Sequence, residues 1–193
     1  MKVITIGREY GAGGHSIGTR VAKELGIEFY DKDIIMATAK AGGITPESVM
    51  DGEEERSLLD SVIQAISPVS YVDKKDTVFE IESEVIKQLA AKGPCVILGR
   101  CAESILKDTP TETLSVFIYA DEAHRMERAA EVLNERDPDK VRRALRKIDR
   151  ARSSYCYYHT GHEWADCHNY DLALDSGTLG YDMCVKMICE AAR

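Results

Sequence analysis

A glycine-rich stretch near the N-terminus, GREYGAGGHSIG over residues 7–18, has the composition of a phosphate-binding loop. It follows a β-branched run, VITIG, and precedes a segment in which Ile17, Val21 and Leu25 recur at helical spacing. A turn between a strand and a helix exposes consecutive backbone N–H groups, and the helix dipole adds to their attraction for an anion. We therefore expect a phosphate-binding loop, here called the phosphate loop, made of Gly11, Ala12, Gly13, Gly14, His15 and Ser16.

The phosphate loop departs from the usual motif G-x-x-x-x-G-K-[ST] at two positions. Arg8 stands where the first glycine belongs, and Gly14 stands where the lysine belongs. His15 and Ser16 follow, and the Ser16 hydroxyl could bind a magnesium ion held by a nucleotide. The alternative is a tight strand-to-helix turn with an N-capping serine and no ligand, which we favour less than phosphate binding.

Arg100 is a second residue suited to binding phosphate, because it directly follows an apolar run in the segment ILGRCAES. A guanidinium binds phosphate through two parallel hydrogen bonds and stays charged at any relevant pH. The alternative is a surface arginine that pairs with one of the many carboxylates. Its place at the exit of a buried strand favours a role in phosphate binding.

A strongly basic run lies further along the chain, from Lys140 to Arg152, where seven basic residues accompany one acid, Asp149. Four of the basic residues recur every three to four positions and share a helix face: Arg142, Arg146, Lys147 and Arg150. A solvated helix face is the ordinary explanation, but such faces usually mix signs. Phosphoryl transfer needs cations around the moving group, and Arg125 and Arg128 could frame the same site.

The next stretch, YCYYHTGHEWADCHNYD, is dense in aromatic residues and in metal-binding side chains. The latter are Cys156, His159, His162, Cys167 and His168. A zinc site is conceivable, but the spacing matches no standard ligand pair and contains no C-x-x-C. Packing and hydrogen bonding at the hinge of a lid is the interpretation that we prefer.

Strand-like and helix-like segments alternate along the chain. Strand-like runs cover residues 3–7, 27–30, 95–99, 114–120 and 170–176, and helical patterns lie between them, as over residues 122–133 and 139–152. This alternation predicts an α/β fold with a parallel sheet of about five strands. Ligands bind outside the carboxyl ends of the strands in such sheets, so the phosphate loop, Asp31, Arg100 and Asp121 are expected at one rim.

The bulk properties limit the classes of partner. At 193 residues the chain suits one well-buried core, so we expect a single domain over residues 1–193. A formal net charge of −8 disfavours nucleic acid and anionic membranes as partners. No apolar run approaches the roughly 18 residues of a membrane span and no cleavable leader is seen, which predicts a cytoplasmic protein. The six scattered cysteines fit reduced thiols.

Several longer motifs resemble one known family. REYGAGGHSIGTRVAKELGIEFYDKDII, VILGRCA, VFIYADEAHRMER and KIDRARSSYCYYHTGHEWADCHNYDLALDSGTLG look like segments of the cytidylate kinase-like group of nucleoside monophosphate kinases. The resemblance covers most of the chain apart from residues 44–75, and the last motif is the most specific. It implies a three-layer P-loop fold with a five-stranded parallel sheet, an acceptor-binding helical insertion over residues 31–75 and a lid over residues 123–160.

The resemblance also implies roles for individual residues. The phosphate loop would hold the ATP phosphates, with Mg²⁺ bound through the nucleotide at Ser16. Asp31 and Arg100 would bind the acceptor, and Arg125 would lie near the donor nucleotide, where we also expect Arg128. The cations that we expect to act in catalysis are Arg150 and Arg152 of the lid, joined by Arg8 in place of the missing lysine.

The activity implied by the resemblance is ATP-dependent phosphoryl transfer to a small nucleotide, with CMP or dCMP as the expected acceptor. Cytidylate kinases have a GAGKG loop, whereas this chain reads GAGGH. Two alternatives therefore stay open. One is a catalytically impaired nucleotide-binding protein, and the other is a kinase that acts on a non-nucleotide metabolite.

Overall fold

A central sheet of five parallel strands organises the protein, for which we describe residues 1–31 and 74–193 of a computed structural model. The strand order is β2-β3-β1-β4-β5. The strands are β1 (Val3–Arg8), β2 (Glu28–Tyr30), β3 (Cys95–Leu98), β4 (Thr113–Tyr119) and β5 (Leu172–Asp175). The sheet confirms the predicted α/β class. Most of the insertion over residues 31–75, which the sequence predicts to bind the acceptor, lies outside the described residues.

The central strands are apolar runs because helices cover both faces of the sheet. In β1, Val3 to Gly7 are all buried, and Ile4 lies in register with Val96 of β3 and Leu114 of β4. Residues that alternate along the strands contribute to two separate cores. Ile4 and its neighbours on one face pack in the larger core, whereas Val3 packs in the smaller one.

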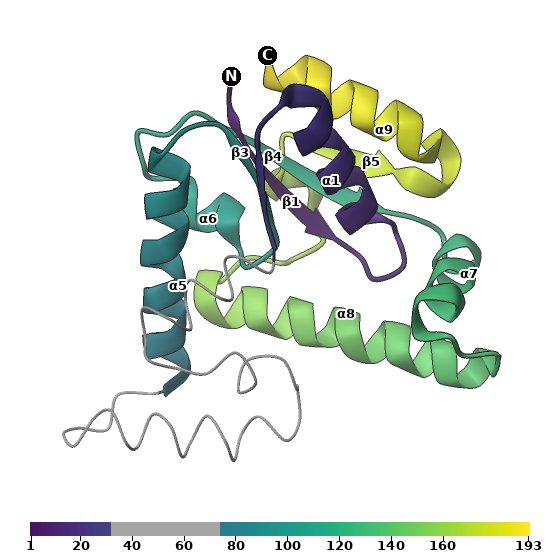
Figure 1. The fold of residues 1–193 in the computed structure, drawn as a ribbon. Coiled ribbons are helices and arrows are strands. Elements are labelled where there is room, and N and C mark those ends of the chain that lie inside the picture. Colours follow the sequence, from purple (N-terminus) through teal and green to yellow (C-terminus); the bar gives the residue numbers. More distant parts are fainter. Residues whose placement is uncertain (32–73) are drawn as a thin grey trace.

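Figure 1 shows a helical layer on each side of the sheet, so the fold has three layers. On one side, α1 (Gly14–Leu25) and α9 (Ser176–Ala192) pack in the larger core through residues such as Ile17 and Ile188. On the other side, α5 (Lys74–Ala91) and α6 (Ala102–Leu106) pack in the smaller core through Ile86 and Leu106. Both termini of the chain lie at the same end of the sheet (Figure 1).

Two further helices extend past the opposite end of the sheet, α7 (Glu122–Leu133) and α8 (Pro138–Thr160). Figure 1 shows α8 crossing below the carboxyl ends of the strands. A small apolar cluster made of Ala129, Val141 and Leu145 joins the two helices. The sequence predicts an end near residue 152, but α8 continues to Thr160, and Gly161 ends it in a left-handed conformation with φ 70°.

A short 3-10 helix, η1 (Cys167–Asn169), leads into β5. The aromatic residues around it pack as expected for this stretch: the Phe117 ring lies 5.3 Å from Trp164 and 5.0 Å from Tyr170. The Tyr170 hydroxyl donates to the carbonyl of Trp164 at 2.8 Å. Among the described helices, none has the length and apolar character needed to cross a membrane.

Candidate active site

The phosphate loop joins the end of β1 to the start of α1, as the sequence predicts. Gly13 is the N-cap residue of α1, with φ 78°, and no side chain caps the first turn. The first N–H groups of an α-helix have no partner within the helix. Together with the helix dipole, these groups form a site that attracts an anion.

The side chain of Arg8 accounts for the glycine at position 14. A Cβ at Gly14 would lie 2.6 Å from Cβ and 2.8 Å from Cγ of Arg8, which is closer than non-bonded carbon atoms approach. The guanidinium of Arg8 continues past the phosphate loop to Gly99, where an added Cβ would overlap its Nη1 atom. Arg8 thus spans the rim from the phosphate loop to the turn after β3.

Three arginines meet at this rim. Arg152 of α8 donates from Nη1 to the backbone carbonyl of Arg8 at 2.8 Å, and its guanidinium lies 5.7 Å from the centre of the Tyr10 ring. Burial, and then the charges of Arg152 and Arg100, lower the pKa of Arg8 to about 9 despite the opposing effect of Asp31. Burial also lowers the pKa of Arg152. A bound anion would offset the excess positive charge of this cluster.

Arg100 is held by a buried carboxylate. Its Nη1 lies 3.3 Å from Oε1 of Glu82, a side chain that is only 1% exposed. The Tyr155 hydroxyl of α8 donates to the other oxygen of Glu82, and the Arg100 guanidinium lies 5.8 Å from the centre of the Tyr155 ring. Burial acts to lower the pKa of Arg100, but Glu82 and Tyr155 outweigh it and raise that pKa. Arg100 is therefore charged, and its guanidinium is held in place by Glu82 and Tyr155.

Asp149, the one acid in the basic run, ties α8 to the phosphate loop and to α7. Its carboxylate accepts from the backbone N–H of Tyr10 at 2.8 Å and from Nη1 of Arg125 at 2.7 Å. Arg125 also pairs with Glu9 at 3.2 Å, and its side chain is only 14% exposed. Two carboxylates thus occupy the Arg125 guanidinium, which holds α7 and α8 against the end of β1.

The phosphate loop is also packed from its outer side. A Cβ at Gly11 would overlap the backbone of Arg125, and one at Gly13 would overlap the Tyr181 ring. The hydroxyl of Ser176, which is fully buried at the start of α9, lies 2.7 Å from the carbonyl oxygen of Ala12 and donates to it. Helices α7 and α9 therefore fix the path of the loop.

Comparison with known proteins supports a kinase. The model of the cytidylate kinase-like family matches residues 3–178. The chain belongs to this family. No curated protein matches it. Membership supports a phosphotransferase, and the P-loop kinase fold is seen again in the solved structures that resemble the chain.

Three solved structures illustrate the fold of this cytidylate kinase-like protein. An uncharacterized protein from Eubacterium ventriosum ATCC 27560 has a TM-score of 0.74 at 24% identity, over 100% of this chain and 98% of that one. Shikimate kinase from Bacteroides thetaiotaomicron has a TM-score of 0.55 at 12% identity, over 98% and 97%. A gluconokinase from Sinorhizobium meliloti 1021 has a TM-score of 0.54 at 15% identity, over 99% and 93%.

The residues predicted for the site of this cytidylate kinase-like protein differ in their surroundings. Arg8, Arg100 and Arg152 meet there, whereas Arg150 is exposed on α8. Arg128 pairs with Glu131 at 2.7 Å and lines a cavity of about 130 Å³ between α7 and α9.

Asp31 follows the end of β2. There His15 Nε2 lies 3.6 Å from Oδ2 of Asp31, which the sequence places on the acceptor side. The carboxylate of Asp31 also acts electrostatically on Arg8 and Arg100. The structure thus brings together the phosphate loop, Asp31 and Arg100, three features that the sequence places at separate strand ends.

Sequence reasoning missed the residues that position these cations. Glu82 falls between Ile81 and Val85 in a helical stripe of apolar positions, so an acid there is anomalous and could have been noticed. Asp149 also stands out, because it is the one negatively charged residue in a basic run. Tyr155 carries no such pattern, because its partner is 73 residues away in the chain.

Proposed function

We propose that this protein transfers the γ-phosphoryl group of ATP to a nucleoside monophosphate, with CMP or dCMP as the preferred acceptor. The observation that carries this proposal is the meeting of Arg8, Arg100 and Arg152 beside the phosphate loop. Phosphoryl transfer spreads negative charge over three oxygens, and catalysis consists mainly of positioning and of cationic stabilisation. The choice of CMP or dCMP rests on the family.

The residues present fit ATP and Mg²⁺. The first turn of α1 offers backbone N–H groups to phosphate, and the Arg8 side chain passes Gly14 and places its guanidinium at the rim near Gly99. The Ser16 hydroxyl forms no hydrogen bond with another described residue, so it is available to a metal ion. When bound, Mg²⁺ would neutralise part of the phosphate charge.

In this proposal the arginines have separate roles. Arg100 holds the acceptor phosphate, and the buried pair with Glu82 fixes its direction. Arg8 and Arg152 stabilise the charge on the transferring group as its bond to the leaving ADP breaks and its bond to the acceptor oxygen forms. The attacking phosphate oxygen is already an anion, so the step requires no general base. Helices α7 and α8 provide the lid region, within residues 123–160.

A coupled assay of ADP release tests the proposal with CMP, dCMP, UMP and AMP as acceptors. We expect ADP release that depends on Mg²⁺ and is fastest with CMP or dCMP. Binding of ATP without acceptor-stimulated turnover would leave a nucleotide-binding protein only. Turnover with a phosphate-accepting metabolite, and with none of the four monophosphates, would show a metabolite kinase instead.

A further inference from the structure

Three metal-binding side chains that take no part in the proposed transfer lie together behind the rim: Cys101, Glu103 and Cys156. One ligand atom from each lies within 4.8 Å of those of the other two. Cys101 directly follows Arg100 in the turn between β3 and α6, and Cys156 directly follows Tyr155 on α8. Both cysteines are buried, with exposures of 6% and 2%.

The chemistry of this cluster suits a cation. No lysine, arginine or histidine in residues 1–31 and 74–193 forms an ion pair with Glu103. Two adjacent thiols and a carboxylate form a ligand set that prefers thiophilic metals over Mg²⁺ or Ca²⁺.

The three ligand atoms are spaced closely enough to bind one ion. Around Zn²⁺, with bonds of about 2.3 Å, two thiolate sulfurs lie roughly 3.8 Å apart. The present separations, all within 4.8 Å, exceed that value by about 1 Å at most.

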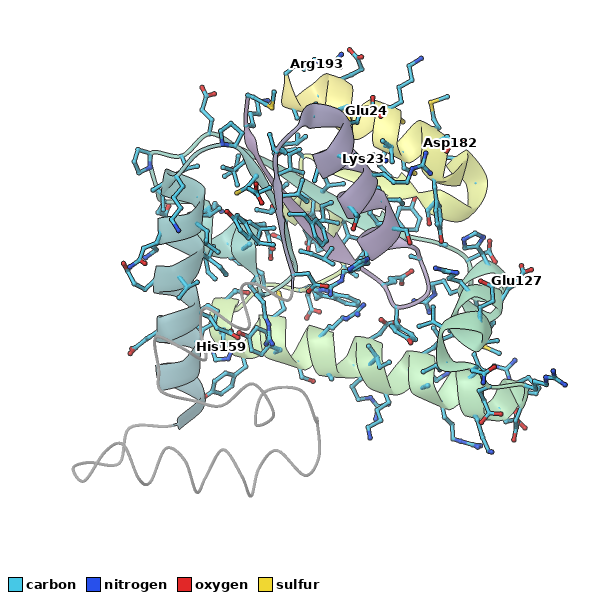
Figure 2. The ribbon with its side chains drawn as sticks, viewed as in Figure 1. Lys23, Glu24, Glu127, His159, Asp182 and Arg193 are labelled. Carbon is cyan, nitrogen blue, oxygen red and sulfur yellow. The ribbon has the colours of Figure 1, made fainter. Side chains whose placement is uncertain are left out.

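A cavity lies next to the cluster. It has a volume of about 450 Å³ and is lined by residues that include Thr160 and His162. The Sγ atom of Cys156 lies 3.6 Å from Oγ1 of Thr160 and 3.7 Å from the carbonyl oxygen of His162. Figure 2 labels His159, another residue that lines the cavity, where the end of α8 meets α5. The Cys156 thiol is therefore in contact with two residues that line the cavity.

We propose that Cys101, Glu103 and Cys156 bind a thiophilic divalent cation of the Zn²⁺ type, with a fourth coordination position left for water. Binding displaces the protons of both thiols, and that of the Glu103 carboxyl where it is protonated, and no electron is transferred because Zn²⁺ is not redox active. The bound ion would join α8 to the turn after β3, next to Arg100 and Tyr155. This proposal does not depend on the proposed kinase activity.

The test measures metal binding by the full chain, reduced and stripped of metal, without nucleotide. Zn²⁺ is titrated in competition with a chromophoric chelator, and Co²⁺ is added separately as a spectroscopic probe. We expect one Zn²⁺ per chain, and for Co²⁺ a thiolate charge-transfer band with the visible bands of a tetrahedral site. Cys156→Ser and Cys101→Ser should abolish these bands, and Glu103→Gln should weaken Zn²⁺ binding at least about tenfold.

Cys167→Ser is the matched control, because Asp166, Cys167 and His168 form an exposed cluster of the same ligand types. This variant should bind Zn²⁺ as the wild type does. If it loses binding while Cys156→Ser keeps it, the ion binds at the exposed cluster and the proposal is wrong. A reduced wild-type chain that binds no Zn²⁺ also overturns the proposal.

Folding of each metal-free variant is checked by circular dichroism. If the cysteine variants do not fold, Glu103→Gln decides, because Glu103 is partly exposed and glutamine has nearly its shape. Unchanged Zn²⁺ affinity and an unchanged Co²⁺ spectrum in a folded Glu103→Gln variant would contradict the ligand set. A metal-dependent rise in the thermal midpoint of the wild type, absent from Glu103→Gln, would support it.

Discussion

Arg8 lies over Gly14 so closely that a Cβ at position 14 would be 2.6 Å from Cβ and 2.8 Å from Cγ of the arginine. The two departures from the usual phosphate-binding motif are therefore coupled. An arginine at the first position requires a residue without a side chain at the lysine position. The same arginine adds a cation to the rim, because its side chain passes Gly14 and its guanidinium lies near Gly99.

We expect Gly14→Lys to fail to restore a conventional phosphate loop. Overpacking against Arg8 should lower the free energy of unfolding by about 1–3 kcal/mol. The double variant Arg8→Gly/Gly14→Lys removes the clash, so it should recover most of that loss and more activity than Gly14→Lys has. Denaturant unfolding and ADP release measure both effects. A single Gly14→Lys variant as stable as the wild type would show that the two positions are not coupled.

Arg152 and Arg150 offer a matched comparison on one helix. Arg152 donates to the carbonyl of Arg8 at 2.8 Å, whereas Arg150 is exposed. We expect Arg152→Ala to lower turnover by about 10²-fold, which is typical of losing one group that stabilises transition-state charge. Arg150→Ala should change turnover by less than about threefold in the arrangement described here. The reverse order in steady-state ADP release would show that α8 moves and that Arg150 is the cation that reaches the substrate.

Tyr155→Phe tests whether the buried carboxylate positions Arg100. The change removes the hydroxyl that donates to Glu82, a side chain with 1% exposure. Loss of a buried hydrogen bond to a charged group should lower the free energy of unfolding by about 1–3 kcal/mol. It should also raise KM for the acceptor more than it lowers kcat. Tyr157→Phe is the control, because Tyr157 is exposed on the same helix. Equal KM values in the two variants would remove Tyr155 from this role.

Asp175 should make the start of α9 sensitive to acid. Its carboxylate accepts from the Thr178 hydroxyl at 2.9 Å and from the backbone N–H groups of Thr178 and Gly177. These bonds, with the Thr178 hydroxyl first, lower the pKa of Asp175. Because the folded-state pKa lies below the unfolded value, the stabilisation is complete above about pH 4 and is lost as the pH falls through the folded-state pKa.

We therefore expect Asp175→Ala to lower the free energy of unfolding by about 1 kcal/mol near neutral pH, as for other N-cap residues. The difference from the wild type should shrink as the pH falls below about 4. Asp175→Asn keeps a capping oxygen without the charge, so it should lose less stability and show a weaker pH dependence. A difference between Asp175→Ala and the wild type that stays constant with pH would argue against an ionised cap. Urea unfolding at several pH values provides these comparisons.

Much of the fold could be predicted from the sequence. The central strands are mostly apolar, and the predicted run over residues 95–99 contains β3 (Cys95–Leu98). Helix α7 begins and ends where predicted, because Asp121 caps it and its apolar pattern stops at Leu133. The end of α8 was placed too early, since the aromatic residues after Arg152 resemble a loop in composition. In the structure they extend the helix until Gly161.

The sequence by itself determines the local features of this protein: the apolar runs that become strands, the phosphate loop between β1 and α1, and the motifs of the family. Only the tertiary structure decides which cations meet at that loop. Arg152 and Arg8 are 144 positions apart, and Tyr155 and Glu82 are 73 positions apart. Periodicity describes which face a residue occupies on its own helix. The partner that this face meets depends on the packing of α8 below the sheet, which spacing along the chain does not encode.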